Sequence, residues 1–306
     1  MVITGDNGVY EYAECVFSFG YRVSVPQNFR EVLHGDGLVL CLALLNSRTP
    51  EIPAVAAACG YDAIYVDLEH TSTSLETAAM LCAGAAGAGI GGLVRVPSQD
   101  PAVIARVLDG GAAGIIVPHV DSVEEAQAVV AAARFPPVGR RSISGPTVIS
   151  GFGPRSPSEL TACLDRGTAV AVMVETPDAV RAADAIAAAP GIDMILIGVS
   201  DLTAEMGIHG DYENEDFHFA VSSVAAACRK HGVTLGVAGI KSVALLERFV
   251  GLGLRFISAG TDIGMMTEAA TSRALTLRGL STGPETKPHR AAQQEDRCPP
   301  RSIRSK

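Results

Sequence analysis

Residues 168–177, TAVAVMVETP, and residues 193–201, DMILIGVSD, decide how this chain folds. Each is a short apolar run followed closely by an acidic side chain, Glu175 in the first and Asp201 in the second. The Ala-rich stretch 178–189 between them has the length and composition of a helix. A strand, a helix and a second strand in this order are typical of a parallel sheet with crossover helices.

The same alternation of short apolar runs and Ala-rich stretches continues in both directions. We expect strands at residues 38–46, 63–69, 92–97, 114–120, 169–175, 194–200, 234–239 and 255–260. We expect helices at residues 50–60, 74–87, 100–111, 122–135, 178–189, 217–232 and 242–253. Each strand is apolar on both faces, as expected when helices cover one face and a barrel interior fills the other. The pattern predicts a (β/α)8 TIM barrel, and no GxGxxG motif follows the first strand to favour a dinucleotide site.

Segments at both ends and one long internal stretch fall outside this alternation. We predict an N-terminal extension at residues 1–30, a barrel domain at residues 31–280 and a disordered polar tail at residues 281–306. Residues 136–157 are rich in Gly, Pro and Ser and are long for a connection inside a barrel. We therefore expect them to cover or line the mouth of the active site.

Composition excludes several classes of function. The 306 residues carry a net charge of −9 and no run of Lys or Arg in the body of the chain, which argues against a nucleic-acid partner. No stretch has the length and hydrophobicity of a membrane span, and the N-terminus does not resemble a secretion signal. The seven cysteines show no CxxC pairing, so we predict a reducing, cytoplasmic setting without a disulfide framework.

Active sites of such barrels lie at the C-terminal ends of the strands, and this position selects the candidate residues. Glu175 and Asp201 offer hard oxygen ligands, which predict a divalent metal site. Mg²⁺ is the expected ion, with Mn²⁺ or Co²⁺ as alternatives, and two protein ligands leave positions for water and a substrate. The alternative is that either carboxylate caps the next helix or pairs with an arginine.

Further polar residues stand at the ends of the second, third and fourth predicted strands. His70 lies close to Asp67 and Glu69, which can orient its ring, and it is the predicted acid/base group. Arg95 interrupts an apolar run and is suited to hold a carboxylate or a developing oxyanion, or alternatively to form a structural ion pair. His119 is a weaker candidate for substrate binding.

Several motifs occur in a fixed order along the chain. They are DLEH at 67–70, VRVP at 94–97, GIIVPHVDSVEEA at 114–126, RFPPVGRR at 134–141, VET at 174–176, and GVSDL at 198–202 with MG at 206–207. Together they resemble the HpcH/HpaI aldolase family over residues 37–270. That resemblance implies a metal-dependent barrel acting on pyruvate-like 2-oxo acids, similar to 2-dehydro-3-deoxyglucarate aldolase. The VPH and RSIS stretches resemble macrophomate synthase most.

The resemblance also implies roles for individual residues. The implied roles are metal binding for Glu175 and Asp201, stabilisation of the enolate oxygen for Arg95, and acid/base catalysis for His70 with Asp67. It further implies that the backbone of Gly198, Val199 and Ser200 holds the substrate carboxylate and that Asp109 approaches the site from a neighbouring subunit. Family members are typically hexamers, built as trimers of dimers that exchange a C-terminal helix, which corresponds here to residues 264–279.

The chain departs from the family pattern at three places. Met173 stands where the family usually has Gln, Val199 stands where it has Pro, and RRSIS at 140–144 replaces RG-x-G. The expected reaction is cleavage of a 4-hydroxy-2-oxo acid, or decarboxylation of oxaloacetate, through a pyruvate-type enolate. The departures indicate that the substrate need not be a sugar-acid aldol.

Three other functions remain open from the sequence. One is the formation of a carbon–carbon bond, as in macrophomate synthase. A second is a CoA-ester lyase, which would need a basic groove that the sequence does not indicate. The third is a barrel without catalysis that serves as a binding protein. No lysine stands at a predicted strand end, so an aldolase that uses a Schiff base is disfavoured.

Overall fold

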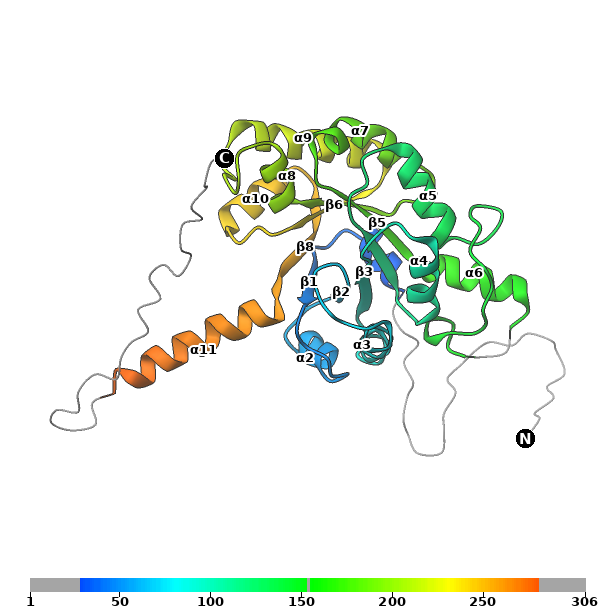
Figure 1. Cartoon of the computed structure of the whole chain (residues 1–306), viewed down its shortest axis with the longest axis horizontal. Helices are drawn as coiled ribbons and strands as arrows, with labels where there is room; N and C mark the ends of the chain where they lie inside the picture. The colour runs from blue at the N-terminus through cyan, green and yellow to red at the C-terminus, as the bar shows by residue number, and fades with distance from the viewer. Residues whose placement is uncertain (1–27, 153–154, 281–306) are drawn as a thin grey trace, which may run out of the picture. The chain divides into compact units, whose positions relative to one another are not determined.

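The computed structural model describes residues 28–152 and 155–280. Its strands are all parallel and form a closed barrel in chain order, so the predicted (β/α)8 architecture is confirmed (Figure 1). The strands are β1 (Val39–Leu44), β2 (Ala63–Asp67), β3 (Gly91–Arg95), β4 (Gly114–Val117), β5 (Ala169–Val174), β6 (Met194–Gly198), β7 (Thr234–Ala238) and β8 (Leu254–Thr261). Residues 1–27, the bulk of the predicted extension, and residues 281–306, the whole predicted tail, lie outside the described residues.

Helices follow most of the strands. They are α1 (Phe29–His34), α2 (Ile52–Ala58), α3 (Leu75–Gly87), α4 (Pro101–Asp109), α5 (Val123–Ala133), α6 (Pro157–Gly167), α7 (Pro177–Ala188), α8 (Val199–Glu205), α9 (Glu215–His231), α10 (Val243–Gly251) and α11 (Asp262–Arg278), with a short 3-10 helix η1 (Val148–Ser150). All seven predicted helices are present. The sequence pattern did not predict α1, α6 or α8.

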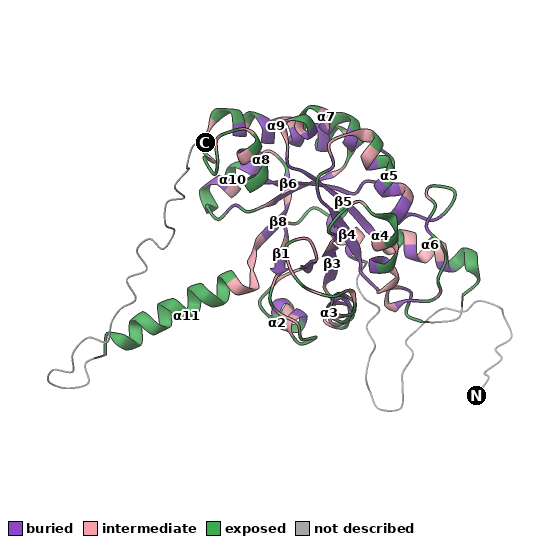
Figure 2. Ribbon diagram, viewed as in Figure 1, coloured by how far each residue is buried: buried purple, intermediate pink, exposed green. Residues whose placement is uncertain are grey.

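The buried side chains form two layers because successive residues of a strand point to opposite faces. One layer lies between the strands and the helices and is rich in Val, Ile and Leu. The other fills the barrel interior with smaller or flexible side chains, including Ala43, Ala171, Met173, Met194 and Leu196. Figure 2 shows the strands buried and most barrel helices buried on their inner sides only. Residues that continue the interior layer past the C-terminal ends of the strands face the mouth of the barrel.

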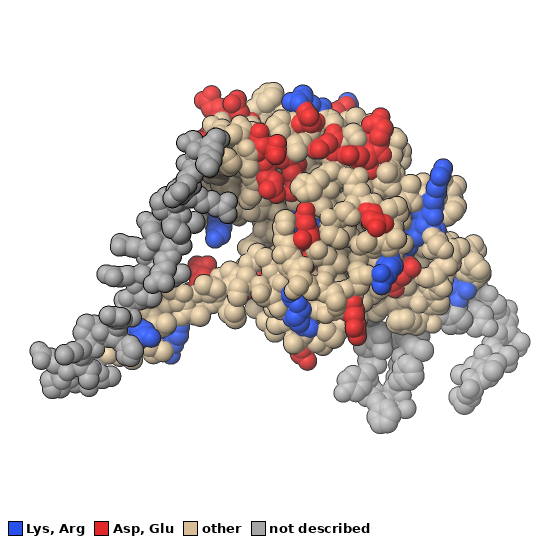
Figure 3. Space-filling view, in the orientation of Figure 1, with Lys and Arg blue, Asp and Glu red and all other residues tan. Residues whose placement is uncertain are grey.

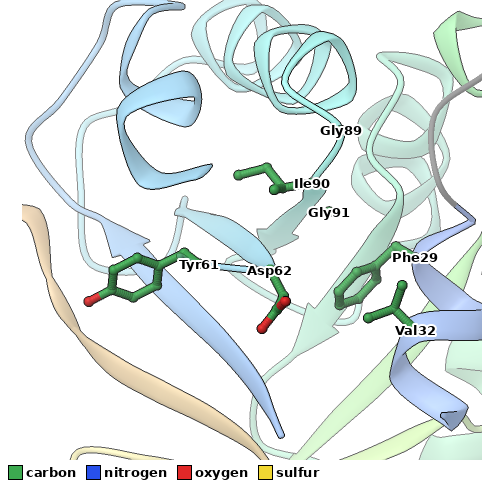
Figure 4. Close-up of a pocket in the computed structure, with 7 residues that line it drawn as sticks. All are labelled: Phe29, Val32, Tyr61, Asp62, Gly89, Ile90 and Gly91. Carbon is green, nitrogen blue, oxygen red and sulfur yellow. The ribbon is translucent and has the colours of Figure 1, made fainter. Parts of the chain in front are cut away.

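Helix α1 packs at the N-terminal end of the barrel. Phe29 and Leu33 of this helix are buried, and Phe29 lies against Gly91, where a Cβ atom would come within 2.3 Å of its ring. Figure 4 shows Phe29 beside a small pocket of about 60 Å³ that Tyr61 and Asp62 also line. Helix α1 spans the boundary that we place at residue 31, and that boundary stays a prediction.

The described residues of the Gly- and Pro-rich stretch, 136–152 and 155–157, lie at the opposite end of the barrel from the one we expected. The guanidinium of Arg134, just before it, donates hydrogen bonds to the carbonyl oxygen of Thr168 at 2.8 Å and to Asp193 at 2.7 Å, both next to strand starts. Ile149 within the stretch packs against the interior layer beside Phe29. Because α5 runs back from the mouth, the connection after it starts at the N-terminal face. The expectation that this stretch covers the mouth of its own barrel is therefore wrong.

The chain divides into two compact units, Met1–Met265 and Met266–Lys306. Within the first unit, the carboxylate of Asp262 accepts hydrogen bonds from the main-chain N–H groups of Leu45, Asn46 and Ser47. This contact ties the start of α11 to the loop after β1. The described part of the second unit begins with residues 266–278 of α11, and the side chains of these residues are exposed.

Surface charge and hydrophobicity bear on possible partners. Acidic side chains gather over the face that carries α7, α8 and α9 in the view of Figure 3. Within residues 28–152 and 155–280, none of the helices combines the length and the hydrophobicity needed to span a lipid bilayer.

Candidate active site

Four residues lie at or directly after the C-terminal ends of their strands, on the side that faces the barrel interior. In β2 the residues that point into the barrel are Ala63, Tyr65 and Asp67, and Asp67 is the last of them. In β3 the same alternation places Arg95 at the C-terminal end of the strand, above Leu93. In β5 and β6 the alternation places Glu175 above Met173 and Gly198 above Leu196. The period of two along a strand thus brings Asp67, Arg95, Glu175 and Gly198 to the inner side of the barrel mouth.

The connection from β5 to α7 holds Glu175 in place. Thr176 is the N-cap of α7 and accepts a hydrogen bond from the N–H of Ala179 at 3.0 Å, and Pro177 occupies the first turn. Pro at this position and a Thr cap both favour an immediate helix start. Glu175 is therefore the single residue between the strand and the helix cap, and it is only 2% exposed.

Neighbouring backbone atoms fix the carboxylate of Glu175. The main-chain N–H of His119 donates to Glu175 Oε2 at 3.0 Å, and a Cβ atom on Gly198 would lie 2.4 Å from Oε1. Burial raises the pKa of Glu175 above its usual range; the His119 N–H opposes this shift, and the charges of Asp201 and Glu69 add to it. A buried carboxylate surrounded by other carboxylates is a favourable place for a cation.

Asp201 lies in the first turn of α8, which begins directly after β6. Its side chain is exposed, and its charge acts on Glu175. The sequence predicted the acid at this position but treated residues 194–200 as one strand. The strand ends at Gly198 instead, and Val199 and Ser200 already belong to α8.

Arg95 and Asp67 form a two-bond ion pair. Arg95 Nε donates to Asp67 Oδ1 at 3.0 Å and Nη2 donates to Oδ2 at 2.7 Å. Burial alone would raise the pKa of Asp67, but the hydrogen bonds and charge of Arg95 outweigh it and lower the pKa below its usual range. Such paired contacts hold a guanidinium plane in a fixed direction. The ion pair that we considered as an alternative role for Arg95 is present, and it lies within the candidate site.

Glu69 connects several of the predicted residues. Its Oε2 lies 3.1 Å from Arg95 Nη1 and 3.7 Å from His70 Nε2, and its Oε1 lies 3.1 Å from His119 Nε2. The other ring nitrogen of His119, Nδ1, lies 3.3 Å from Glu175 Oε2. The ring of His119 thus bridges the ends of β2 and β5.

His119 has an unusual backbone conformation. Its φ angle is +53°, in the left-handed region that non-glycine residues seldom adopt. The side-chain amide of Gln99 donates to its carbonyl oxygen at 2.8 Å, and its N–H donates to Glu175. Strained residues of this kind persist where surrounding contacts hold them, and they cluster at functional sites.

The structure brings His70 and Asp67 together only through the main chain. The N–H of His70 lies 3.4 Å from Asp67 Oδ1, whereas the ring points to Glu69 and is 60% exposed. Asp109 lies at the C-terminal end of α4, where Arg141 Nη2 donates to its carboxylate at 2.7 Å. Because α4 runs back toward the strand starts, Asp109 does not join the site of its own chain.

Two of the three departures from the family pattern, Met173 and Val199, occupy different layers. Met173 is buried in the barrel interior directly below Glu175, where it packs with other apolar side chains. The side chain of Val199 is buried in the outer layer, so only its main chain faces the mouth. Met173 therefore changes the floor of the site, and Val199 leaves the side chains of the site unchanged.

The donor set suits a hard divalent ion with open coordination positions. Across the ranges that the structure covers, no three His, Cys, Asp or Glu side chains are grouped as metal ligands. Glu175 and Asp201 supply oxygen only, at a place where Gly198 leaves room beside Oε1. Mg²⁺ and Mn²⁺ accept such oxygen ligands together with water and substrate.

Comparisons with known proteins agree with this arrangement. A 4-hydroxy-4-methyl-2-oxoglutarate aldolase of Hapsidospora irregularis is 37% identical over 267 residues, which cover 86% of this chain and 94% of that protein. An enzyme of the same name from Chaetomium globosum is 36% identical over 230 residues, or 74% of this chain and 85% of that protein. These names agree with the predicted enzyme class, an aldolase-type carbon–carbon lyase.

Solved structures show the same fold. The crystal structure of an HpcH/HpaI aldolase from Desulfitobacterium hafniense DCB-2 matches with a TM-score of 0.78 at 27% identity, covering 83% of this chain and 97% of that one. Macrophomate synthase shares the fold with a TM-score of 0.70 at 24% identity, covering 83% of this chain and 89% of that one. Residues 41–269 match the description HpcH/HpaI aldolase/citrate lyase. As its ordered motifs predicted, this chain belongs to the HpcH/HpaI aldolase/citrate lyase family.

Proposed function

We propose that this chain is a divalent-metal-dependent lyase that cleaves a 4-hydroxy-2-oxo acid and releases a pyruvate-type product. The observation that carries the proposal is the set of contacts at the mouth, where Glu69 joins Arg95 to His119, and His119 contacts Glu175, whose carboxylate is affected by the charge of Asp201. The names of the relatives that are 36% and 37% identical support 4-hydroxy-4-methyl-2-oxoglutarate as the first substrate to test.

Glu175 and Asp201 would hold the metal ion, with Mg²⁺ as the expected ion. The raised pKa of Glu175, caused first by burial and further by the charges of Asp201 and Glu69, supports this assignment, because a cation would relieve the crowding of negative charge. A bound divalent ion would act as a Lewis acid toward the keto oxygen of the substrate.

We propose that Arg95 stabilises the negative charge that develops on the keto oxygen during cleavage. Asp67 engages two of the five N–H donors of its guanidinium through hydrogen bonds, and Glu69 lies 3.1 Å from Nη1, so further N–H donors stay available for a substrate. A donor group that is already oriented stabilises developing charge without rearrangement during the reaction.

Cleavage also requires removal of the proton from the 4-hydroxyl group. The exposed ring of His70 is the proposed proton acceptor, and His119 is the proposed contact for the rest of the substrate. The main chain from Gly198 to Ser200, at the start of α8, is the proposed place for the substrate carboxylate.

The proposal also covers how the subunits assemble. We infer a homo-oligomer, a hexamer in the simplest case, in which Asp109 of one subunit approaches the site of another. The placement of Asp109 at the end of its own barrel that lies opposite the site supports a role between subunits. The proposed compartment is the cytoplasm.

A metal-supplemented assay of pyruvate release tests the function. The substrates are 4-hydroxy-4-methyl-2-oxoglutarate, other 4-hydroxy-2-oxo acids and oxaloacetate. We expect Arg95→Ala to lower kcat about 10²- to 10³-fold, the range for loss of a donor to a developing oxyanion. Glu175→Ala is expected to abolish metal-dependent turnover.

Glu205→Ala is the matched control, because Glu205 is exposed at the end of α8 and makes no described contact with the site. It should retain wild-type turnover. Equal rates for the wild type and Glu175→Ala, or full activity after exhaustive chelation, would refute the assignment.

A further inference from the structure

We propose that Glu69 is a positioning residue that orients Arg95 and His119 together, and this inference rests on the proposed function of the same site. Its carboxylate side chain is only 10% exposed and stands between the two partners. Each of its oxygens faces a different nitrogen, Oε2 facing Arg95 Nη1 and Oε1 facing His119 Nε2, both at 3.1 Å.

The contact with Arg95 completes the support of the guanidinium. Asp67 engages Nε and Nη2, which fixes the plane of the group but leaves Nη1 without support from that residue. Glu69 supplies the contact at Nη1 from the loop that follows β2. Each of the three nitrogens therefore faces a carboxylate oxygen, which fixes the direction of the guanidinium.

The contact with His119 acts on the other side of the site. The main chain of His119 is fixed by Gln99 and Glu175, but the ring is 59% exposed and needs side-chain contacts to hold one rotamer. The Glu69 carboxylate lies 3.1 Å from Nε2 and the Glu175 carboxylate lies 3.3 Å from Nδ1, so two carboxylates flank the ring. Glu69 thereby links the residue proposed to stabilise charge with the residue proposed to contact the rest of the substrate.

Two substitutions separate positioning from charge. Glu69→Met keeps an unbranched side chain of similar length but removes both strong acceptors. Glu69→Gln removes the charge and keeps an acceptor oxygen for Arg95, while its amide NH₂ can donate to a neutral His119 ring. A positioning role predicts that Glu69→Gln retains most of the oxalate affinity and kcat that Glu69→Met loses. A purely electrostatic role predicts the same result for both variants.

Binding of oxalate in the presence of Mg²⁺ is the first measurement. Oxalate is a planar dianion with the shape of the pyruvate enolate, and isothermal titration follows its binding without turnover. We expect Glu69→Met to weaken oxalate binding about 10-fold and Glu69→Gln to stay within about threefold of the wild type, the range of coupling between contacting residues. An electrostatic role predicts tighter oxalate binding in both variants, because each removes a negative charge from the site.

Steady-state kinetics are the second measurement. We expect Glu69→Met to lower kcat about 10- to 100-fold with a smaller change in KM, since misplacement of a catalytic group acts mainly on the transition state. His119→Asn is expected to raise KM more than it lowers kcat. Asn tolerates the left-handed backbone at this position and keeps the main-chain N–H to Glu175, so the variant removes only the ring.

Glu76→Met is the matched control. Glu76 follows the same strand, lies in the first turn of α3 and is exposed. Oxalate binding and kcat should equal those of the wild type. Thermal melts establish that each variant is folded, and if Glu69→Met fails to fold, Glu69→Ala takes its place.

The outcomes separate this inference from the proposed function. If the wild type cleaves no 2-oxo acid but its oxalate binding depends on residue 69 as described, the proposed function fails and the positioning role stands. Equal behaviour of Glu69→Met and Glu69→Gln overturns the positioning role, as does wild-type behaviour of Glu69→Met. A wild type that binds no oxalate with Mg²⁺ also overturns it.

Discussion

At the scale of single residues, Gly198 makes room for the carboxylate of Glu175. Its φ angle of −86° is open to any residue, so the need for glycine comes from space and not from backbone strain. We expect Gly198→Ala to displace Glu175, because the added Cβ would lie 2.4 Å from Oε1. Affinity for Mg²⁺ or Mn²⁺ should fall about 10-fold or more, the range for changes beside a metal ligand. Direct metal titration measures it.

Gly87→Ala is the control for this substitution. Gly87 lies at the end of α3, and an added Cβ there meets no atom within 4 Å. Metal affinity should be unchanged in this variant. Wild-type metal affinity in Gly198→Ala would show that Glu175 is not a ligand.

At the scale of elements, buried ion pairs join α1, α5 and β6 at the N-terminal end of the barrel. Asp193 precedes β6, and its carboxylate accepts hydrogen bonds from Arg134 Nη2 and Arg30 Nε, both at 2.7 Å. Removing one partner of a buried pair costs about 3 kcal/mol or more. We therefore expect Asp193→Asn to lower Tm by roughly 6 to 12 °C, measured by calorimetry.

The same carboxylate makes stability depend on pH. Burial alone would raise the pKa of Asp193, but the hydrogen bond with His34 and the charges of Arg134 and Arg30 outweigh it and lower the pKa. A lowered folded-state pKa adds stability above the unfolded value of about 3.9, and this stability is lost as pH falls through the folded value. Tm of the wild type should thus fall below about pH 4, and less steeply in Asp193→Asn. Asp36→Asn, exposed near α1, should follow the wild-type profile.

The elements also show what the sequence could and could not predict. All eight strands were predictable because each is a short apolar run between helices, and Glu175 and Arg95 were predictable because charge at a strand end is unusual. Helix α8 was missed because its first residues continue the apolar pattern of β6. The placement of residues 136–157 failed because sequence length does not tell at which end of a barrel a connection lies.

Side-chain contacts between strands were not predictable. The link from Glu69 to Arg95 and His119 joins the ends of three strands, and its geometry depends on how the barrel closes. The nearest signal in the sequence was the spacing of Asp67 and Glu69. Residues two apart continue to point inward only while the strand continues, and β2 ends at Asp67.

At the scale of the whole molecule, the exposed apolar side chains of α11 predict assembly. Met266, Leu275 and Leu277 on this helix are 61%, 68% and 46% exposed, more apolar surface than one helix of a monomer usually leaves in water. We expect light scattering after gel filtration to give the mass of a hexamer for the full chain. Replacing Leu275 and Leu277 with Asp should lower that mass.

Phe219→Asp is the control for assembly, because Phe219 is 74% exposed on a different helix, α9. Its mass should equal that of the wild type. A full chain that runs as a monomer at micromolar concentration would contradict the predicted oligomer.

The alternation that brings Asp67, Arg95 and Glu175 to the mouth of the barrel also limits how this enzyme can diverge. Inserting or deleting one residue in β2, β3 or β5 would turn the charged side chain away from the mouth and into the layer beneath the helices. New substrates must therefore arise through changes in the loops that follow the strands, while strand lengths stay constant. Exchanging whole loops between relatives is accordingly the way to transfer selectivity without losing the chemistry.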